Sequence, residues 1–482
     1  MEVKKMTLFA NFVNENSKHN HRSYINSSVR FHHPFTFEDR LRAALSVGWN
    51  VFDFPAEYTL VDLLSDSGTG AMTVKQFASM FEADEAYGTN WGSCLLLETV
   101  ERIFGINVIG KSPEWETYGF HQCRAAEHAF FTQIGKDKSG LVIPSNGHFD
   151  TTRANIEANG LIALDVPSCE KPNFRGNMDI SALELLLSTK DVPLVFCTIT
   201  NNTMAGQPVS LENIENISRL CNKANKAFFL DACRFAENAW FIKKFEHPEM
   251  TIPEIVLKMF SFCDGFTISY KKDGLANMGG GLYIKKASPL PKRYPNILED
   301  LRDHQICVEG HKSYFGMSGR DIMTVHTGLP TVVTQEYLDG RIGQVHRFGE
   351  YMMELGLPVV EPFGGHAVYL DMDKFYEGTK MDRKDFGGIS LTSLLLLSGP
   401  RLCELGAFAF GRFDGKKEIF PPFNYVRCAV PRLKYEIEDL YFVADCVKYL
   451  HDRRDTIPKA VPIFGQEKAL RHMKARFELV SR

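Results

Sequence analysis

The chain has 482 residues, 44% of them hydrophobic and 24% charged, and carries a formal net charge of −4 at neutral pH. A mildly acidic surface of this kind attracts neither nucleic acid nor an anionic membrane, so neither is expected as a partner. The eleven cysteines never occur as Cys-x-x-Cys, and no run of eighteen apolar residues is present. These features favour a cytoplasmic protein with reduced thiols over a disulfide-linked, zinc-binding or membrane-spanning one.

Residues 1–30 are polar and rich in Asn, His and Ser, which predicts a loosely ordered arm. From Val61 to about Gly319, short β-branched or aromatic runs alternate with helical periodicity, as in the strand expected at residues 192–199. The helix that follows should begin after an N-cap at Ser210, with apolar residues three or four positions apart along one face. Such alternation predicts a doubly wound, mostly parallel sheet with right-handed crossovers.

After about Thr324 the pattern changes to a long amphipathic helix, a few strands such as residues 366–371, and further helices. This change predicts a smaller α+β domain at the C-terminal end of the chain. The Pro421-Pro422 pair marks a connecting loop within it.

The most informative segment is residues 269–274, Ser-Tyr-Lys-Lys-Asp-Gly, which follows an apolar run and precedes Met278-Gly-Gly-Gly. A second ammonium beside a lysine makes its proton costlier to hold, so Lys271 and Lys272 together favour a neutral, nucleophilic amine. The alternative is a solvated turn, which is the commoner setting for a pair of adjacent lysines.

Upstream, an apolar run ends on Asp231, and Arg234 follows three residues later. A carboxylate at the end of a parallel strand meets ligands in the crevice above the sheet. Pyridoxal phosphate needs such a carboxylate to keep its ring nitrogen protonated, and Arg234 would face the phenolic oxygen of that cofactor. Alternatively, Asp231 is a helix N-cap and Arg234 belongs to a surface ion pair.

Several blocks now identify a resemblance. They are residues 62–71, 84–87, 120–127, 149–152, 205–210, 364–368, 426–432 and 471–472. In their order and number they resemble the tryptophanase and tyrosine phenol-lyase family, β-eliminating lyases that use pyridoxal phosphate. The resemblance implies an α/β fold of the aminotransferase-like type (fold type I). It also implies a large cofactor-binding domain at 61–324, a small domain built from 31–60 with 325–482, and an active site between the two.

The resemblance also implies the cofactor site. The phosphate would be held by Gln122, the Cys123 amide, Arg124 and the Ser269 hydroxyl, where a helix opens with an arginine in its first turn. Phe149 would stack on the ring, Asn202 would bind the phenolic oxygen, and Lys272 would bind the aldehyde. Relatives usually carry Gly at position 123 and a small residue at position 270. The Cβ of Cys123 either displaces the phosphate slightly or is harmless because only the N–H is used.

For the substrate, Arg427 is the cation expected to bind the amino-acid carboxylate through two hydrogen bonds. The nearby Arg432 is not expected to bind the substrate. Ser65 and Ser67 lie in a loop that relatives use beside the substrate. Tyr87 would come from a neighbouring subunit to protonate the leaving ring carbon; its alternative is a packed aromatic residue. A potassium ion would bind the following oxygen donors: Glu85, the Gly68 carbonyl and the Asn277 carbonyl.

The leaving group is predicted from three positions. Leu405 stands where phenol-forming members carry an arginine, and an apolar side chain cannot compensate a phenolic oxygen. Asp150 could accept the indole N–H, and His472 could line the ring pocket. The predicted reaction is therefore elimination of L-tryptophan to indole, pyruvate and ammonia, with Lys272 as the base at the α-carbon beside Lys271, in a homotetramer with shared sites.

Two alternatives stay open. The same chemistry could act on tyrosine, cysteine or a substituted tryptophan. The departures at Cys123, Tyr270 and Ser65 also allow a catalytically weak binding protein of the same fold.

Overall fold

The computed structural model describes residues 24–25, 29–136 and 139–481. The chain divides into two units, residues 1–31 and residues 32–482, and each is described by itself. The arm expected at residues 1–30 lies almost wholly outside the described residues. Within the part that the structure describes, no helix has the length and apolar character needed to span a membrane.

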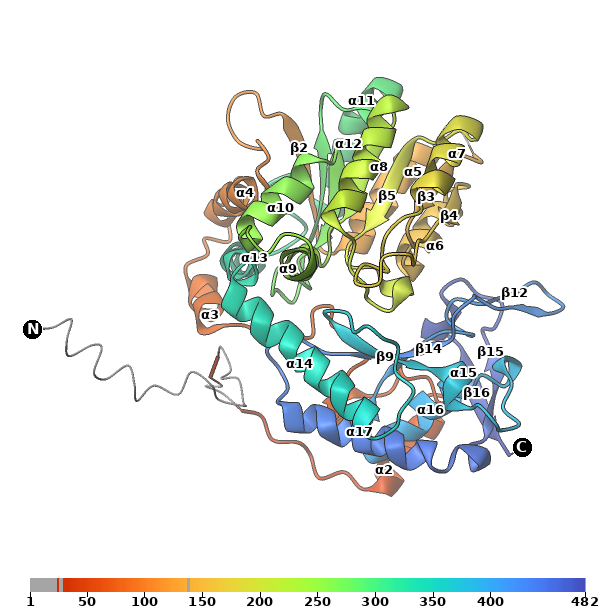
Figure 1. Cartoon of the computed structure of the whole chain (residues 1–482). Helices are drawn as coiled ribbons and strands as arrows, with labels where there is room; N and C mark the ends of the chain where they lie inside the picture. Colours follow the sequence, from red (N-terminus) through yellow and green to blue (C-terminus); the bar gives the residue numbers. More distant parts are fainter. Residues whose placement is uncertain (1–23, 26–28, 137–138, 482) are drawn as a thin grey trace, which may run out of the picture. The chain divides into compact units, whose positions relative to one another are not determined.

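A seven-stranded sheet forms the centre of the larger part of the second unit (Figure 1). Its strands, in spatial order, are β2 (Trp115–Phe120), β8 (Gly280–Lys285), β7 (Gly265–Ser269), β6 (Ala227–Asp231), β5 (Leu194–Thr198), β3 (Val142–Ser145) and β4 (Ile162–Asp165). The strands from β7 to β4 run parallel, whereas β8 is antiparallel to both β7 and β2.

Helices cover both faces of this sheet, because alternate strand residues point to opposite sides. In β5 and β6, Val195 and Phe228 pack into one apolar core, while Phe196 and Phe229 pack into another. The surrounding helices are α5 (Cys123–Gly135), α6 (Asp150–Ala158), α7 (Ile180–Thr189), α8 (Leu211–Lys223), α9 (Phe235–Phe245), α10 (Ile252–Ser261), α11 (Pro289–Arg293) and α12 (Ile297–Glu309). The predicted doubly wound sheet is confirmed.

The predicted start of helix α8 and the predicted strand at residues 192–199 are also confirmed. The Ser210 hydroxyl accepts a hydrogen bond from the Asn213 N–H at 3.2 Å and begins α8, as its N-cap position predicted. The helix buries Leu211, Ile214, Ile217 and Leu220 along the expected face. Strand β5 lies inside the predicted range of 192–199.

The C-terminal part contains a three-stranded antiparallel sheet in the order β11 (Cys403–Leu405), β14 (Tyr425–Ala429) and β9 (Ala367–Asp371). Helices α14 (Gln335–Glu354), α16 (Gly387–Leu395) and α17 (Ile437–His451) enclose its core. The long α14 matches the amphipathic helix expected after Thr324. The loop expected at Pro421-Pro422 lies between β13 (Glu418–Ile419) and β14.

Chain segments near both predicted domain limits pack across them. Strand β1 (Val61–Asp62) pairs with β10 (Pro400–Arg401), and Leu63 joins the C-terminal core. Helix α13 (Gly319–Val332) runs through residue 324 and packs on α3 (Val74–Phe81) and α4 (Trp91–Phe104). The limits at residues 60 and 324 stay predictions.

The remaining α-helices and β-strands of the described residues are α2 (Phe37–Ser46), α15 (Met372–Phe375), β12 (Arg412–Phe413), β15 (Lys459–Phe464) and β16 (Arg476–Val480).

Candidate active site

One cavity lies where β6 and β7 end and α5 begins, at the carboxyl edge of the large sheet. It gathers most of the predicted site residues from both ends of the chain. These are Ser65, Ser67, Gln122, Cys123, Arg124, Phe149, Asp150, Asn202, Asp231, Arg234, Ser269, Lys271, Lys272, Leu405, Arg427 and His472. The structure thus brings them together, while the role of each stays a prediction.

The lysine loop is a tight turn after β7. The Lys272 N–H donates to the Ser269 carbonyl at 3.2 Å, and the Gly68 N–H donates to the Lys271 carbonyl at 2.7 Å. Both lysine side chains line the cavity rather than the outer surface. Burial, and then the charges of Lys272 and Arg124, lower the pKa of Lys271. This is the direction that the adjacent ammonium groups predicted.

Asp231 ends β6 and is 5% exposed. One of its oxygens accepts the Cys233 N–H at 3.3 Å, and among the described residues it has no ion-pair partner. The N-cap alternative for Asp231 is wrong, because α9 begins at Phe235 and its first-turn N–H groups donate to Asp273 instead.

Glu127 also lines the cavity and was not singled out from the sequence. Burial, followed by the charge of Asp231, raises the pKa of Glu127 to about 8. The Thr152 hydroxyl donates to this carboxyl group at 2.6 Å. The Glu127 carboxyl group therefore keeps its proton to a higher pH than an exposed glutamate does.

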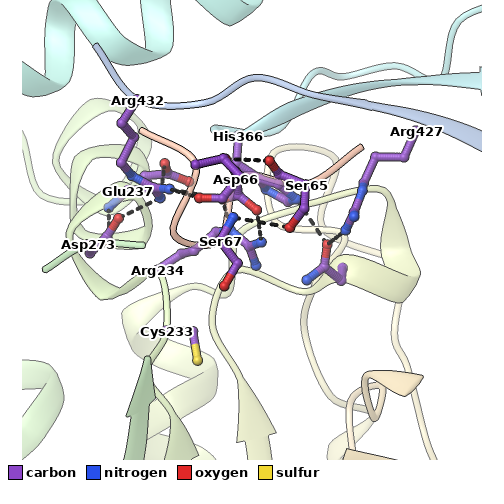
Figure 2. Close-up of polar contacts among 12 residues, drawn as sticks. Ser65, Asp66, Ser67, Cys233, Arg234, Glu237, Asp273, His366, Arg427 and Arg432 are labelled. Atoms are coloured by element: carbon purple, nitrogen blue, oxygen red, sulfur yellow. Dashed lines mark hydrogen bonds and ion pairs between the residues drawn. The ribbon is translucent and has the colours of Figure 1, made fainter. Parts of the chain in front are cut away.

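Arg234 is paired with Asp66 through two hydrogen bonds, Nε to Oδ2 at 3.0 Å and Nη2 to Oδ1 at 2.7 Å (Figure 2). The two side chains are 3% and 1% exposed, so the surface ion pair considered for Arg234 is wrong. Burial opposes ionisation of Asp66, but the nearby cationic groups hold its pKa well below the usual value.

At the end of the cavity where the phosphate is predicted to bind, α5 starts at Cys123, and its N-cap residue, Gln122, makes no side-chain capping bond. The first N–H groups of a helix have no intrahelical partner, and Arg124 lines the cavity beside them, so the predicted phosphate contacts lie together. Gly280 packs so tightly here that a Cβ would lie 2.3 Å from the Cys123 nitrogen. The Cys233 thiol donates to the Cys123 sulfur at 3.9 Å, and this bond and burial raise the pKa of Cys123.

Tyr270, the other departure from the relatives, does not line the cavity. Its side chain is fully buried in the core and its hydroxyl is hydrogen-bonded to that of Tyr283. The extra bulk at position 270 therefore fills the space behind the lysine loop.

Arg427 extends from β14 and is 5% exposed. It donates to the Leu64 carbonyl at 3.0 Å and to the Asn202 side-chain oxygen at 3.4 Å. The same Asn202 oxygen accepts the Tyr369 hydroxyl at 3.0 Å. Asn202 begins a short 3₁₀ turn, so it is a turn residue and a cavity residue at once.

Asp150 and His472 lie side by side in the cavity although they are far apart in the sequence. His472 Nε2 is 3.1 Å from Asp150 Oδ2. Burial opposes ionisation of Asp150, but the His472 hydrogen bond and charge lower its pKa overall. Phe52 packs edge-on against His472, with ring centroids 5.4 Å apart. Phe52 and Met473 line the cavity and were missed from the sequence, because single apolar residues carry no spacing signal.

Four predicted residues lie outside this cavity. Tyr87 is 61% exposed in the single chain, and its hydroxyl accepts the His311 N–H at 3.2 Å, so it is not a buried core residue. Glu85 accepts the Gly319 N–H at 2.8 Å and pairs with Arg320. The Gly68 carbonyl accepts the Asn277 side-chain amide at 2.9 Å. In the described part of the chain, no cluster of three or more His, Cys, Asp or Glu side chains could hold a metal ion.

The large sheet, the smaller C-terminal sheet and a lysine at the end of β7 define a pyridoxal phosphate enzyme of fold type I. Among solved structures, the threonine aldolase of Leishmania major matches with a TM-score of 0.54 and 14% identity, over 81% of this chain and 99% of that chain. At this identity the match concerns the fold alone.

The β-eliminating lyase model matches residues 62–445. The tryptophanase of Hyphomonas neptunium is 38% identical, over 92% of this chain and 95% of the relative. The tyrosine phenol-lyase of Symbiobacterium thermophilum is 34% identical, over 92% and 96%. The chain belongs to the β-eliminating lyase family, and it is a pyridoxal phosphate-dependent carbon–carbon lyase.

Proposed function

We propose that this enzyme eliminates the side chain of L-tryptophan, giving indole, pyruvate and ammonia. The observation that carries the choice of substrate is Leu405, an apolar residue 3% exposed that lines the cavity together with Phe52. An apolar wall accommodates an indole ring and leaves a phenolic oxygen without a partner. Asp150, whose carboxylate is kept ionised by His472, can accept the indole N–H.

The residues present fit pyridoxal phosphate. Asp231 is a buried carboxylate without an ion-pair partner among the described residues, and a buried charge of this kind calls for a cation such as a protonated ring nitrogen. Gln122, the Cys123 amide, Arg124 and Ser269 would hold the phosphate, and Phe149 would stack on the ring. When bound, the cofactor supplies an electron sink for the charge left at the α-carbon.

The side chains of this enzyme supply the proton transfers and the binding. Arg427, held by the Leu64 carbonyl and Asn202, orients the substrate carboxylate. Lys272 takes the α-proton. The adjacent Lys271, whose pKa is lowered first by burial, lines the same cavity. Ser65 and Ser67 line the substrate side of the cavity.

We further propose that Tyr87 protonates the indole carbon of a neighbouring subunit. It is exposed in its own protomer and does not line its own cavity, as a residue serving a neighbour would be. The homotetramer, the cytoplasmic location and a potassium site at Gly68, Glu85 and Asn277 are part of the same proposal.

Product analysis tests the choice of substrate. One cofactor-saturated sample is incubated separately with tryptophan, tyrosine and cysteine, and indole, phenol, sulfide and pyruvate are measured in potassium and in sodium buffers. Indole with equimolar pyruvate should dominate by kcat/KM, more strongly in potassium. Faster release of phenol or sulfide than of indole would contradict tryptophan as the preferred substrate. Equal rates in sodium and potassium buffers would contradict the proposed potassium site.

A further inference from the structure

Arg432 binds three carboxylates at once (Figure 2). Its Nη1 lies 2.9 Å from Asp66 Oδ2, and its Nη2 lies 2.7 Å from both Glu237 Oε1 and Asp273 Oδ1. The Arg432 side chain is 3% exposed and does not line the cavity. It is therefore not a substrate ligand; both of its terminal nitrogens bind carboxylates, while its buried Nε has no hydrogen-bond partner among the described residues.

Each of the three carboxylates lies on a segment next to a different predicted site residue, and Asp66 itself lines the cavity. Asp66 lies between Ser65 and Ser67 and holds Arg234 through two hydrogen bonds. Asp273 directly follows Lys272 and accepts the N–H groups of Ala236 and Glu237, at 2.9 and 3.3 Å, at the start of α9.

Glu237 lies on α9, the helix that begins one residue after Arg234. Arg432 itself follows β14, the strand that carries Arg427. A single guanidinium group thus connects the cofactor lysine, the arginine expected at the cofactor phenolic oxygen, the serine loop and the substrate arginine.

The charges in this cluster balance. Three carboxylates, Asp66, Glu237 and Asp273, face three guanidinium groups, Arg234, Arg341 and Arg432, all of them buried. Arg341 from α14 reaches Glu237 at 3.2 Å. Removing one cation from such a cluster leaves buried negative charge uncompensated, so the remaining groups must move or take up protons.

We propose that Arg432 is a positioning residue that fixes Lys272, Arg234 and the Ser65–Ser67 loop relative to one another across the active site. The proposal rests on the proposed function for the roles of Lys272 and Arg234, but not for the choice of substrate.

The carboxyl group of Asp273 provides a signature of this role. Burial, with the charge of Glu237, raises the pKa of Asp273 to about 6, and the charge of Arg432 acts in the opposite direction. Tyr337 and Arg341 of α14 and the adjacent Lys272 complete the titratable and charged groups around it. Below about pH 6 Asp273 is protonated and its ion pair with Arg432 is lost, and without Arg432 this change occurs at higher pH.

The test compares the holoenzyme with the Arg432→Gln and Arg432→Lys variants. Affinity for pyridoxal phosphate, the pH dependence of the bound-cofactor absorbance, and kcat and KM for the best substrate are measured. Arg432→Gln should lower kcat on the order of tenfold or more, because small misplacements of reacting groups are costly. It should also move the acidic limb of the absorbance and rate profiles to higher pH, while Arg432→Lys recovers part of both.

Arg401 offers a matched control, since it is a buried arginine paired with Asp62 in the C-terminal part and does not line the cavity. Arg401→Gln should lower the melting temperature without moving the pH profile. If Arg432→Gln is insoluble, Asp273→Asn serves instead and should remove the pH-dependent change near pH 6.

An unchanged pH profile and cofactor affinity in Arg432→Gln, or the same changes in Arg401→Gln, would overturn the positioning role. These outcomes leave the proposed function intact, because that function is judged on the products of the unmodified enzyme.

Discussion

Asp66 and Arg234 form a buried, two-bonded ion pair at 2.7 and 3.0 Å, although 168 positions separate them in the sequence. The pair fixes the plane of the Arg234 guanidinium group, and it joins the serine loop to the end of β6. The arginine expected to face the cofactor therefore has its orientation set by a residue that no motif singled out.

Replacing Asp66 with Asn should destabilise the protein by about 3–5 kcal/mol near pH 7, since it leaves two buried guanidinium groups short of a counter-charge. The pKa of Asp66 is depressed in the folded state, so its contribution is present above the unfolded pKa and is lost as pH falls through the folded value. Urea unfolding of both proteins at pH 7 and pH 2 measures this difference, because the loss begins only as pH falls below the ordinary aspartate pKa of 3.8. An equal difference at every pH down to 2 would contradict the charge explanation.

Replacing Lys272 with Ala should abolish elimination and also remove the covalent attachment of the cofactor. Borohydride reduction of the cofactor-saturated enzyme followed by peptide mapping should place the label on Lys272. Lys271→Ala is the matched control, because that side chain lines the same cavity. It should keep the label on Lys272 and lose only part of the rate. A label at Lys271 in the unmodified enzyme would exchange the two roles.

Tyr87→Phe and Lys272→Ala should complement each other if the active sites are shared between subunits. Each variant alone should release little indole, whereas a mixture refolded or co-expressed together should regain activity, because some sites then receive Tyr87 from one subunit and Lys272 from the other. Indole release from purified hybrids is the measurement. Full activity of Tyr87→Phe by itself would remove the tyrosine from the reaction.

Leu405→Arg should shift the products from indole toward phenol. A guanidinium group at this wall of the cavity can meet a phenolic oxygen, and it costs the enzyme an apolar contact with the indole ring. The ratio of kcat/KM for tyrosine to that for tryptophan should rise at least tenfold, because a hydrogen bond to a charged group contributes free energy on that order. Leu405→Met, which keeps the wall apolar, should leave the ratio nearly unchanged.

Cys123→Gly should change the affinity for pyridoxal phosphate by less than about threefold, because its sulfur contacts Cys233 and the helix N–H survives the change. Cofactor titration followed by absorbance measures it. A large gain in affinity would show that the Cβ displaces the phosphate, which is the other outcome considered from the sequence. Cys233→Ala, which removes the sulfur contact from the other side, is the control.

Much of the fold was predictable because it depends on local patterns. The continuous apolar runs of β5 and β6 follow from both faces of a parallel sheet being covered. The Ser210 cap predicted the start of α8 from one residue and its neighbours. The segment around Lys272 was likewise singled out from adjacent residues, and both of its lysines line the cavity, while its role as a cofactor loop stays a prediction.

The sequence alone therefore determined the doubly wound sheet, the family resemblance and many, but not all, of the side chains that meet in the cavity. Only the tertiary structure decided that Arg234 is held by Asp66, that Arg432 joins three carboxylates, and that Tyr87 lies outside its own cavity. The physical reason is that a buried ion pair depends on the distance between segments far apart in the chain, and an isolated Asp or Arg has no periodicity that reveals its partner.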